Sequence, residues 1–199
     1  MNETNKNLPP PMGEKKLLIL QTIAEMLERP TAEKVTTALL AKQLNVSEAA
    51  LYRHFASKAQ MYEGLIEFIE SGVFGVIGQI EATEEAGLKQ AEMIVASLLR
   101  FAQKNRGLTR VLVGDALVHE NPRLQARINQ LLDRIEATLK QCLKIAIAQN
   151  ALLSSAHDAS AHANMLVCFT LGHWQRFVKS GFKEDPLAQW AAQWPLLAR

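Results

Sequence analysis

The stretch from Thr36 to Lys58, TTALLAKQLNVSEAALYRHFASK, constrains the fold of this chain more than any other. It predicts two short helices, a tight turn between them and the start of a third helix. Thr37 can cap the first helix and Ser47 the second, by accepting from free amides of the first turn. Asn45 lies at the turn, where it tolerates the left-handed backbone that a tight turn needs. The side chains predicted to point inward are Leu39, Leu40, Leu44, Leu51 and Phe55.

The second of these helices has a slim, polar outer face. Ala49 and Ala50 keep its beginning narrow, and the polar and basic residues that follow lie towards the outside. Lys58 opens the third helix, where its positive charge opposes the helix dipole, so a nearby anion is expected to explain it. Such a helix suits the major groove of DNA, with flanking contacts to phosphates. The alternative is an ordinary helical hairpin with a solvated face.

The sequence SEAALYRHFASK (47–58) resembles the recognition-helix signature of the TetR family of bacterial DNA-binding proteins. The resemblance implies an N-terminal helix-turn-helix head, a helical body and binding of double-stranded DNA. The phosphate contacts that it implies come from Thr36 or Thr37, Tyr52, His54 and Lys58. The base contacts that it implies come from Ser47, Ala49 and Arg53.

Composition bounds the class of protein without identifying it. Apolar residues make up 48% of the 199 residues, enough for a packed core, and the net charge of +2 is too small to mark a nucleic-acid binder by itself. The two cysteines, Cys142 and Cys168, lie in apolar helical patterns and are expected to be reduced core thiols of a cytoplasmic protein. No apolar run reaches the length of a membrane span, and no signal peptide is recognised.

The sequence carries no motif for catalysis or for a cofactor. The five histidines form no i,i+4 pair, and no cysteine–histidine cluster has the spacing of a zinc site. There is also no glycine-rich phosphate loop and no nucleophile elbow. The sequence therefore predicts a protein that is not an enzyme and that holds neither a metal nor a cofactor.

Periodic apolar residues predict an all-α protein of three parts. These are a disordered arm over residues 1–13, the helix-turn-helix head over 14–57 and a helical dimerisation and partner-binding body over 58–199. A helix from Lys58 to about Ile80 would join the head to the body, with either Phe68 or Ile69 on its apolar stripe. Half-sites in DNA favour a two-fold dimer, which the last two long helices can form through their small residues. The other helices are predicted over about 14–27, 86–104, 108–119, 122–148, 158–180 and 185–190.

Gly72, Gly75 and Gly78 recur every three residues in the second half of the joining helix. Each glycine costs about 1 kcal/mol relative to alanine in a helix. The glycines therefore indicate either a kinked or frayed helix end or a shallow face on which another chain can lie. Asn105 or Gly107 is expected to end the next helix with a left-handed cap.

Four segments of the body resemble one branch of the TetR family, the nucleoid occlusion factors: LIEFIE (65–70), NRGLTR (105–110), RINQLLDRIEA (127–137) and RFVKSGFK (176–183). The resemblance implies a cytoplasmic, nucleoid-associated homodimer that binds scattered pseudo-palindromic chromosomal sites. It also implies that the DNA-bound protein inhibits assembly of the division protein FtsZ, so that division does not cut across the chromosome. The groove expected to take the tail of FtsZ has an apolar floor and a basic end, formed by Phe68, Gly72, Val76, Arg100, Lys104 and Asn105.

The chain departs from this branch at four body positions, in or beside the expected groove. The branch has Arg, Leu, Gly and Pro where this chain has Val76, Ser97, Arg100 and Arg106. The arm before the first helix is also less basic than in the branch. The departures in the body bear on the contact with FtsZ rather than on the head.

A second function remains open from the sequence alone, that of a TetR-type transcriptional repressor released by a small apolar ligand. For that function, three tryptophans could line a pocket in the body instead of packing its core. They are Trp174, Trp190 and Trp194.

Overall fold

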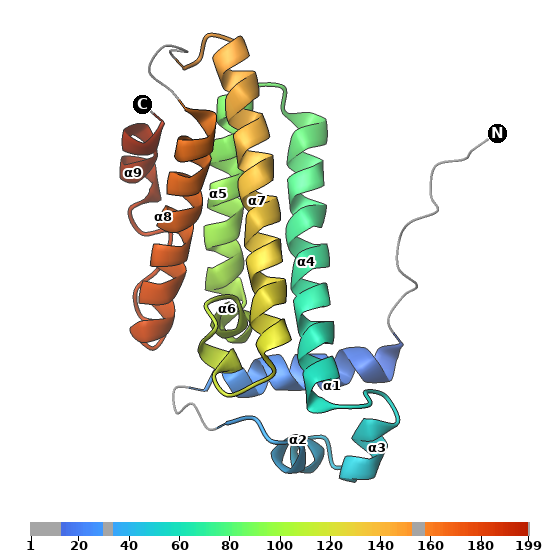
Figure 1. The fold of residues 1–199 in the computed structure, drawn as a ribbon. Coiled ribbons are helices and arrows are strands. Elements are labelled where there is room, and N and C mark those ends of the chain that lie inside the picture. Colours follow the sequence, from blue (N-terminus) through green and yellow to red (C-terminus); the bar gives the residue numbers. More distant parts are fainter. Residues whose placement is uncertain (1–12, 30–33, 153–157, 199) are drawn as a thin grey trace, which may run out of the picture.

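The computed structural model describes residues 13–29, 34–152 and 158–198, so the arm predicted over residues 1–13 lies outside the described residues except for Gly13. Within these ranges the chain is helical and contains no strand, as the sequence predicted. Figure 1 shows a small head formed by the first three helices at one end of a bundle of longer helices. The predicted all-α architecture, a three-helix head joined by a long helix to a helical body, is confirmed for the described residues.

The head consists of α1 (Glu14–Leu27), α2 (Thr37–Gln43) and α3 (Glu48–Tyr52). The predicted cap of α2 is wrong by one residue, because the side chain of Thr36 accepts from the Leu39 amide at 3.2 Å. The Thr37 hydroxyl instead donates to Glu48 Oε2 at 2.6 Å and so ties the start of α2 to the start of α3.

The turn between α2 and α3 has the predicted geometry. Asn45 adopts a left-handed backbone with φ of 55°, and the Ser47 hydroxyl accepts from the Ala50 amide at 3.2 Å. Leu51 and Phe55 are buried, whereas Leu39 is exposed, contrary to the prediction. A helix of only two turns buries one narrow stripe, and Leu40 occupies it.

Helix α4 (Lys58–Thr83) is continuous from the head into the body, past the three glycines. A kinked or frayed end is therefore ruled out, and the helix runs three residues beyond the predicted Ile80. A Cβ added at Gly75 or Gly78 would meet nothing within 4 Å, so the glycines do keep one face of the helix low.

The body is completed by α5 (Gly87–Lys104), α6 (Arg106–Leu112), the 3-10 helix η1 (Asp115–Leu117), α7 (Pro122–Ala148), α8 (Ala159–Lys179) and α9 (Trp190–Leu197). Helices α4, α5, α7 and α8 run along one another, α1 crosses the lower end of the bundle, and α9 lies on the outer side of α8 (Figure 1). The centre of the bundle is filled by apolar side chains, among them Trp174, whose indole nitrogen donates to the Leu98 carbonyl at 3.1 Å.

Two predicted segments of the body are wrong. The helix predicted over 108–119 is divided, because Gly114 adopts a left-handed backbone with φ of 78° between α6 and η1. The last helix does not start at Asp185 but begins at Trp190, after turns over residues 186–189. Neither Asn105 nor Gly107 forms the predicted left-handed cap, since Asn105 has φ of −128° and Gly107 lies inside α6.

Gly107 is required by the close approach of α6 to α1. A Cβ at this position would lie 2.0 Å from the Ala24 carbonyl oxygen and 2.8 Å from its carbon, both in the backbone of α1. No L-residue with a side chain fits there without moving one helix, so this contact fixes how the head meets the body.

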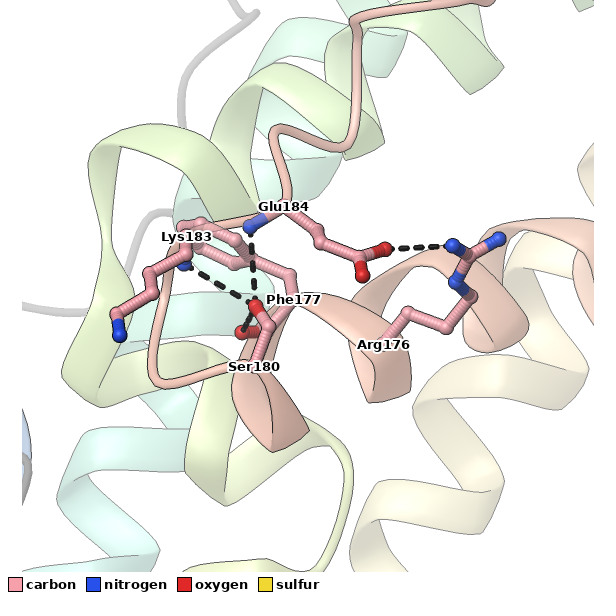
Figure 2. A network of polar contacts seen from close by, with 5 residues as sticks. All are labelled: Arg176, Phe177, Ser180, Lys183 and Glu184. Carbon is pink, nitrogen blue, oxygen red and sulfur yellow. Dashed lines mark hydrogen bonds and ion pairs between the residues drawn. The ribbon is translucent and has the colours of Figure 1, made fainter.

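The end of α8 is closed by the segment that follows it (Figure 2). The Ser180 hydroxyl donates to the Phe177 carbonyl at 2.9 Å and accepts from the amides of Lys183 and Glu184 at 3.1 and 3.0 Å. Arg176 Nη2 pairs with Glu184 Oε2 at 2.6 Å. This network turns the chain back towards α6 and α9.

Replacing Gly107 by alanine tests the contact between α1 and α6. We expect the free energy of unfolding to fall by about 1–3 kcal/mol, the usual cost of overpacking, even though alanine favours a helix. The matched control is Gly75→Ala on the open face of α4, which should raise stability by up to about 1 kcal/mol. Urea unfolding followed by circular dichroism measures both, and equal stability of the two variants would contradict the packing described.

Candidate nucleic-acid interface and partner groove

The surface of α2 and α3 lies at the end of the molecule away from the bundle (Figure 1). Four of the predicted DNA contacts are exposed on this end: Ser47, Ala49, Tyr52 and Arg53. The short first turn of α3 carries only small side chains and Glu48 at its outer face. The helix can therefore approach a base edge closely, as a recognition helix in the major groove must.

The other predicted DNA contacts are more constrained. The Thr36 hydroxyl serves as the cap of α2, and the Thr37 hydroxyl is engaged with Glu48. His54 is half-buried just after α3, and Lys58 is half-buried at the first residue of α4. The structure thus places all eight predicted residues on the head or at its junction with α4, with different access to solvent.

Lys58 has an internal anion as its partner. Its Nζ lies 2.5 Å from Glu120 Oε1, in the loop before α7, and 5.6 Å from the centre of the Tyr62 ring. Burial, and to a lesser degree the charge of Glu120, raises the pKa of the Tyr62 phenol above its ordinary value. The anion that the sequence required near Lys58 is therefore present in the free protein as a carboxylate.

The start of α4 is fixed by a capping arrangement that sequence reasoning missed. The Ser57 hydroxyl accepts from the Gln60 amide at 3.2 Å, and Gln60 Oε1 accepts from the Ala56 amide at 2.8 Å. The signal was available, because Ser-x-x-Gln is a capping-box pattern. Glu120 could not have been found in this way, since it lies 62 residues from Lys58.

Helix α4 is held along its length by three arginines of α7. Two form ion pairs with α4 and the third stacks on an aromatic ring, contacts that orient both helices. They are Arg123 Nε to Glu63 Oε1 at 2.7 Å, Arg127 Nη2 to Glu70 Oε2 at 2.9 Å, and the Arg134 guanidinium at 3.9 Å from the centre of the Phe74 ring. We call these three contacts the α4–α7 ladder.

The predicted partner groove begins at Phe68. Of the alternatives at this turn of α4, Ile69 is buried and Phe68 is 43% exposed, so Phe68 is not a core residue. Val76 is likewise exposed two turns further along, and Gly72 lies between them beside the Phe101 ring of α5. These side chains form a low apolar strip on α4.

Phe68 and Asn105 line one cavity of about 310 Å³. The cavity opens between α4 and α1 rather than between α4 and α5, and Gly72, Val76, Arg100 and Lys104 do not line it. Its floor is apolar, and Gln21, Glu25 and Glu28 of α1 stand on its rim; the complete lining is Leu17, Leu20, Gln21, Ala24, Glu25, Glu28, Leu65, Phe68, Asn105 and Leu108. We call it the α1–α4 groove.

Arg100 and Lys104 stand exposed on α5, next to the apolar strip. Neither makes an ion pair with any residue that the structure describes, and the same holds for Glu25 and Glu28. Arg106, one of the departures from the branch, has its guanidinium 5.9 Å from the centre of the Phe182 ring. Of the helices that pack on α4, α5 therefore carries unpaired cations and the C-terminal end of α1 unpaired carboxylates, as far as the described residues go.

The three tryptophans pack against other side chains of the described residues. Trp174 is fully buried and hydrogen-bonded across to α5, and Trp190 and Trp194 stack on each other at 5.3 Å on the outer side of the bundle.

Cys142 is buried, and its burial raises the pKa of the thiol to about 11. Cys168 was predicted to be a core thiol, and that is wrong, because it is exposed on the outer face of α8.

The described residues form neither a membrane span nor a metal-binding cluster. No helix there is both long and apolar enough to cross a lipid bilayer. The same part of the chain contains no group of three or more His, Cys, Asp and Glu side chains arranged to hold a metal ion.

Solved structures share this fold at low sequence identity. The fatty acid degradation regulator FadR from Bacillus halodurans superimposes with a TM-score of 0.77 at 16% identity, covering 97% of each chain. AibR, solved in complex with isovaleryl coenzyme A and operator DNA, gives a TM-score of 0.73 at 14% identity, covering 92% of this chain and 97% of AibR. These likenesses establish the fold.

Sequence comparison establishes the family. Residues 19–65 match the model described as bacterial regulatory proteins, tetR family, and residues 85–199 match the SlmA-like model described as tetracyclin repressor-like, C-terminal domain. The nucleoid occlusion factor SlmA of Vibrio cholerae is 48% identical over 185 residues, covering 90% of this chain and 92% of the relative. That of Alteromonas mediterranea is 47% identical over 176 residues, covering 88% and 90%.

The head, the fold and these relatives agree on one class of protein, a DNA-binding regulator and not an enzyme. The chain belongs to the TetR family of DNA-binding proteins, in its branch of SlmA nucleoid occlusion factors.

Proposed function

We propose that this protein binds pseudo-palindromic chromosomal sites as a homodimer and, while bound, captures the tail of FtsZ and prevents its assembly over the nucleoid. The observation that carries the proposal is Phe68, a large aromatic residue that is 43% exposed at the α1–α4 groove. Together with the exposed Val76 and the apolar floor of the groove it forms an apolar surface larger than one scattered residue, and such a surface marks an interaction site.

The DNA contacts proposed are those of the head. Ser47, Ala49 and Arg53 face the bases, and Tyr52, His54 and Lys58 reach flanking phosphates, together with Thr36 or Thr37. The backbone and side chains at the start of α2 and α4 suit phosphate, because the positive end of each helix dipole lies there.

The dimer proposed uses the outer face of α8. Ala161, Met165, Cys168 and Gly172 follow one another at helical spacing and are all exposed, Met165 by 44%. Of the small residues expected on this face, Ala163 is buried within the monomer and does not contribute. An apolar stripe of this length on a long helix suits packing against its two-fold mate in a four-helix arrangement with α7.

The partner peptide proposed is short and extended, with apolar residues on Phe68 and along the α1–α4 groove. Its acidic residues would face Arg100 and Lys104 of α5, and a basic residue would face Glu25 and Glu28 of α1. Asn105 lines the groove; its side-chain nitrogen donates to the Phe101 carbonyl at 2.8 Å, and its Oδ1 is the atom that would accept from the peptide backbone. Val76 and Arg100, two of the departures expected from the sequence, both stand exposed on this face.

Binding to DNA is tested by salt dependence and by two substitutions. With about two phosphate contacts from cations in each protomer, we expect a slope of roughly −3.6 for the logarithm of affinity against that of salt. Lys58→Glu should weaken binding to all duplexes and flatten the slope, whereas Arg53→Ala should also change which bases are preferred. Lys144→Glu, at the far end of α7, is the charge-matched control. If Lys58→Glu binds DNA as tightly as the wild type does, Lys58 is not part of the DNA interface.

Dimerisation is tested by sedimentation at micromolar concentration, which should give twice the chain mass of 22.1 kDa. Met165→Glu places a charge in the middle of the α8 stripe and should yield monomers, because an unpaired charge in an apolar interface is costly. Val118→Glu, at another exposed apolar residue outside α8, should leave the dimer intact. A wild-type protein that sediments as a monomer both in the absence and in the presence of DNA would refute the dimer.

The partner groove is tested by titrating a labelled FtsZ tail peptide into the protein with and without an operator duplex. We expect micromolar or weaker affinity, improved by DNA, and reduced by Phe68→Ala, Lys104→Glu and Asn105→Glu without loss of DNA binding. Leu196→Ala removes an exposed apolar side chain on α9 and serves as the control. If the peptide does not bind the DNA complex, the division role fails and a repressor remains.

A further inference from the structure

Two anions, the carboxylate of Glu120 and a phosphate of DNA, would compete for the ammonium group of Lys58. In the free protein its ammonium group lies 2.5 Å from Glu120 Oε1, and both side chains are largely shielded from solvent, with 23% and 12% of their surfaces exposed. Yet Lys58 opens α4 beside the recognition helix, where the proposed function assigns it to a DNA phosphate. Both anions seek the same ammonium protons, and a partly buried pair is screened less by salt than a surface one.

The position of Glu120 connects this competition to the body of the protein. Glu120 belongs to the loop before α7, so it is part of the body, whereas Lys58 belongs to the junction with the head. Within the described residues, no other ion pair joins the 113–121 loop to the first turn of α4. The residues that follow Glu120 begin α7, whose arginines form the α4–α7 ladder.

We infer that Glu120 takes the place of a DNA phosphate in the free protein: its carboxylate pairs with Lys58 there and releases Lys58 when the head binds DNA. The pair lowers the intrinsic affinity of the head for any duplex, because it must be broken before Lys58 reaches a phosphate. Breaking it also frees the loop at the start of α7, so the body carries a contact that differs between the free and the DNA-bound protein. The inference rests on the proposed phosphate contact of Lys58.

The surroundings of the pair support exchange rather than a permanent bridge. Tyr62 packs against Lys58 from the same helix, with the ammonium 5.6 Å from the ring centre, so the lysine stem keeps a platform in either position. The start of α4 is capped by Ser57 and Gln60 and does not depend on Glu120. Lys58 can therefore swing between two anions without unravelling the helix.

The experiment is a double-mutant cycle on DNA affinity, measured by fluorescence anisotropy with one operator duplex and one unrelated duplex over a range of salt. Glu120→Gln keeps the shape of the side chain and removes its charge. We expect it to bind both duplexes roughly three- to tenfold more tightly at low salt, the scale expected for losing one partly exposed ion pair in each of two protomers. In the Lys58→Gln background the same substitution should have no effect.

Two controls separate this exchange from a general change of charge. Glu63→Gln removes a carboxylate that also pairs with a cation at the α4–α7 boundary, Arg123, and should not reproduce the gain. Glu120→Ala repeats the test in case glutamine binds Lys58 through its amide, and thermal unfolding confirms that each variant is folded.

Each alternative result has a defined meaning. Weaker DNA binding by Glu120→Gln would show that Glu120 orients Lys58 towards phosphate, and would overturn the inference. A gain that persists with Lys58→Gln would mean that Glu120 acts through its charge on the DNA alone, and would also overturn it. If Lys58→Gln by itself leaves DNA binding unchanged, the proposed phosphate contact is wrong, and the exchange that depends on it is wrong as well.

Discussion

The contact of α6 with α1 is the constraint on which the rest of the structure depends. Gly107 brings the two backbones so close that a single added carbon would lie 2.0 Å from the Ala24 carbonyl oxygen. Because this contact leaves no room for sliding, the head is oriented by the body through α1 as well as through α4. The α1–α4 groove follows from it directly, since its walls belong to both parts and Leu108 of α6 contributes to its floor.

The long helix α4 adds a second, more polar connection between head and body. Its apolar stripe is buried against α5 and α7, while the α4–α7 ladder and the Lys58–Glu120 pair follow its edge from the body to the recognition helix. Ion pairs of this kind add little to stability individually, but they require particular helix positions. In the exchange proposed above, a change in how the head sits on DNA would reach α7 through Lys58, and the exposed strip from Phe68 to Val76 lies on the same helix.

Local chemistry predicted most of the elements, and it failed where distant parts of the chain meet. The turn at Asn45, the cap at Ser47 and the extents of α1 and α7 all follow from patterns within a few residues, and they are confirmed. The divided α6, the late start of α9 and the internal role of Gly107 are set by packing against α1, α8 and the segment after α8, which periodicity does not record. The site shows the same division: the exposed face of α3 was predictable, whereas the acidic rim of the groove and the partner of Lys58 were not.

The sequence by itself determined the class of this protein, because the helix-turn-helix pattern and its signature residues are contiguous and act through local caps and spacing. It also determined that α4 is long enough to leave the head, and it identified Phe68 as one of two candidates for the buried position. Only the tertiary structure decided that Ile69 is buried and Phe68 exposed, because the direction in which a helix faces is fixed by its neighbours. It likewise decided that Lys58 faces Glu120, since an ion pair between residues 62 positions apart depends on the packing of α4 against the body and on nothing in either local sequence.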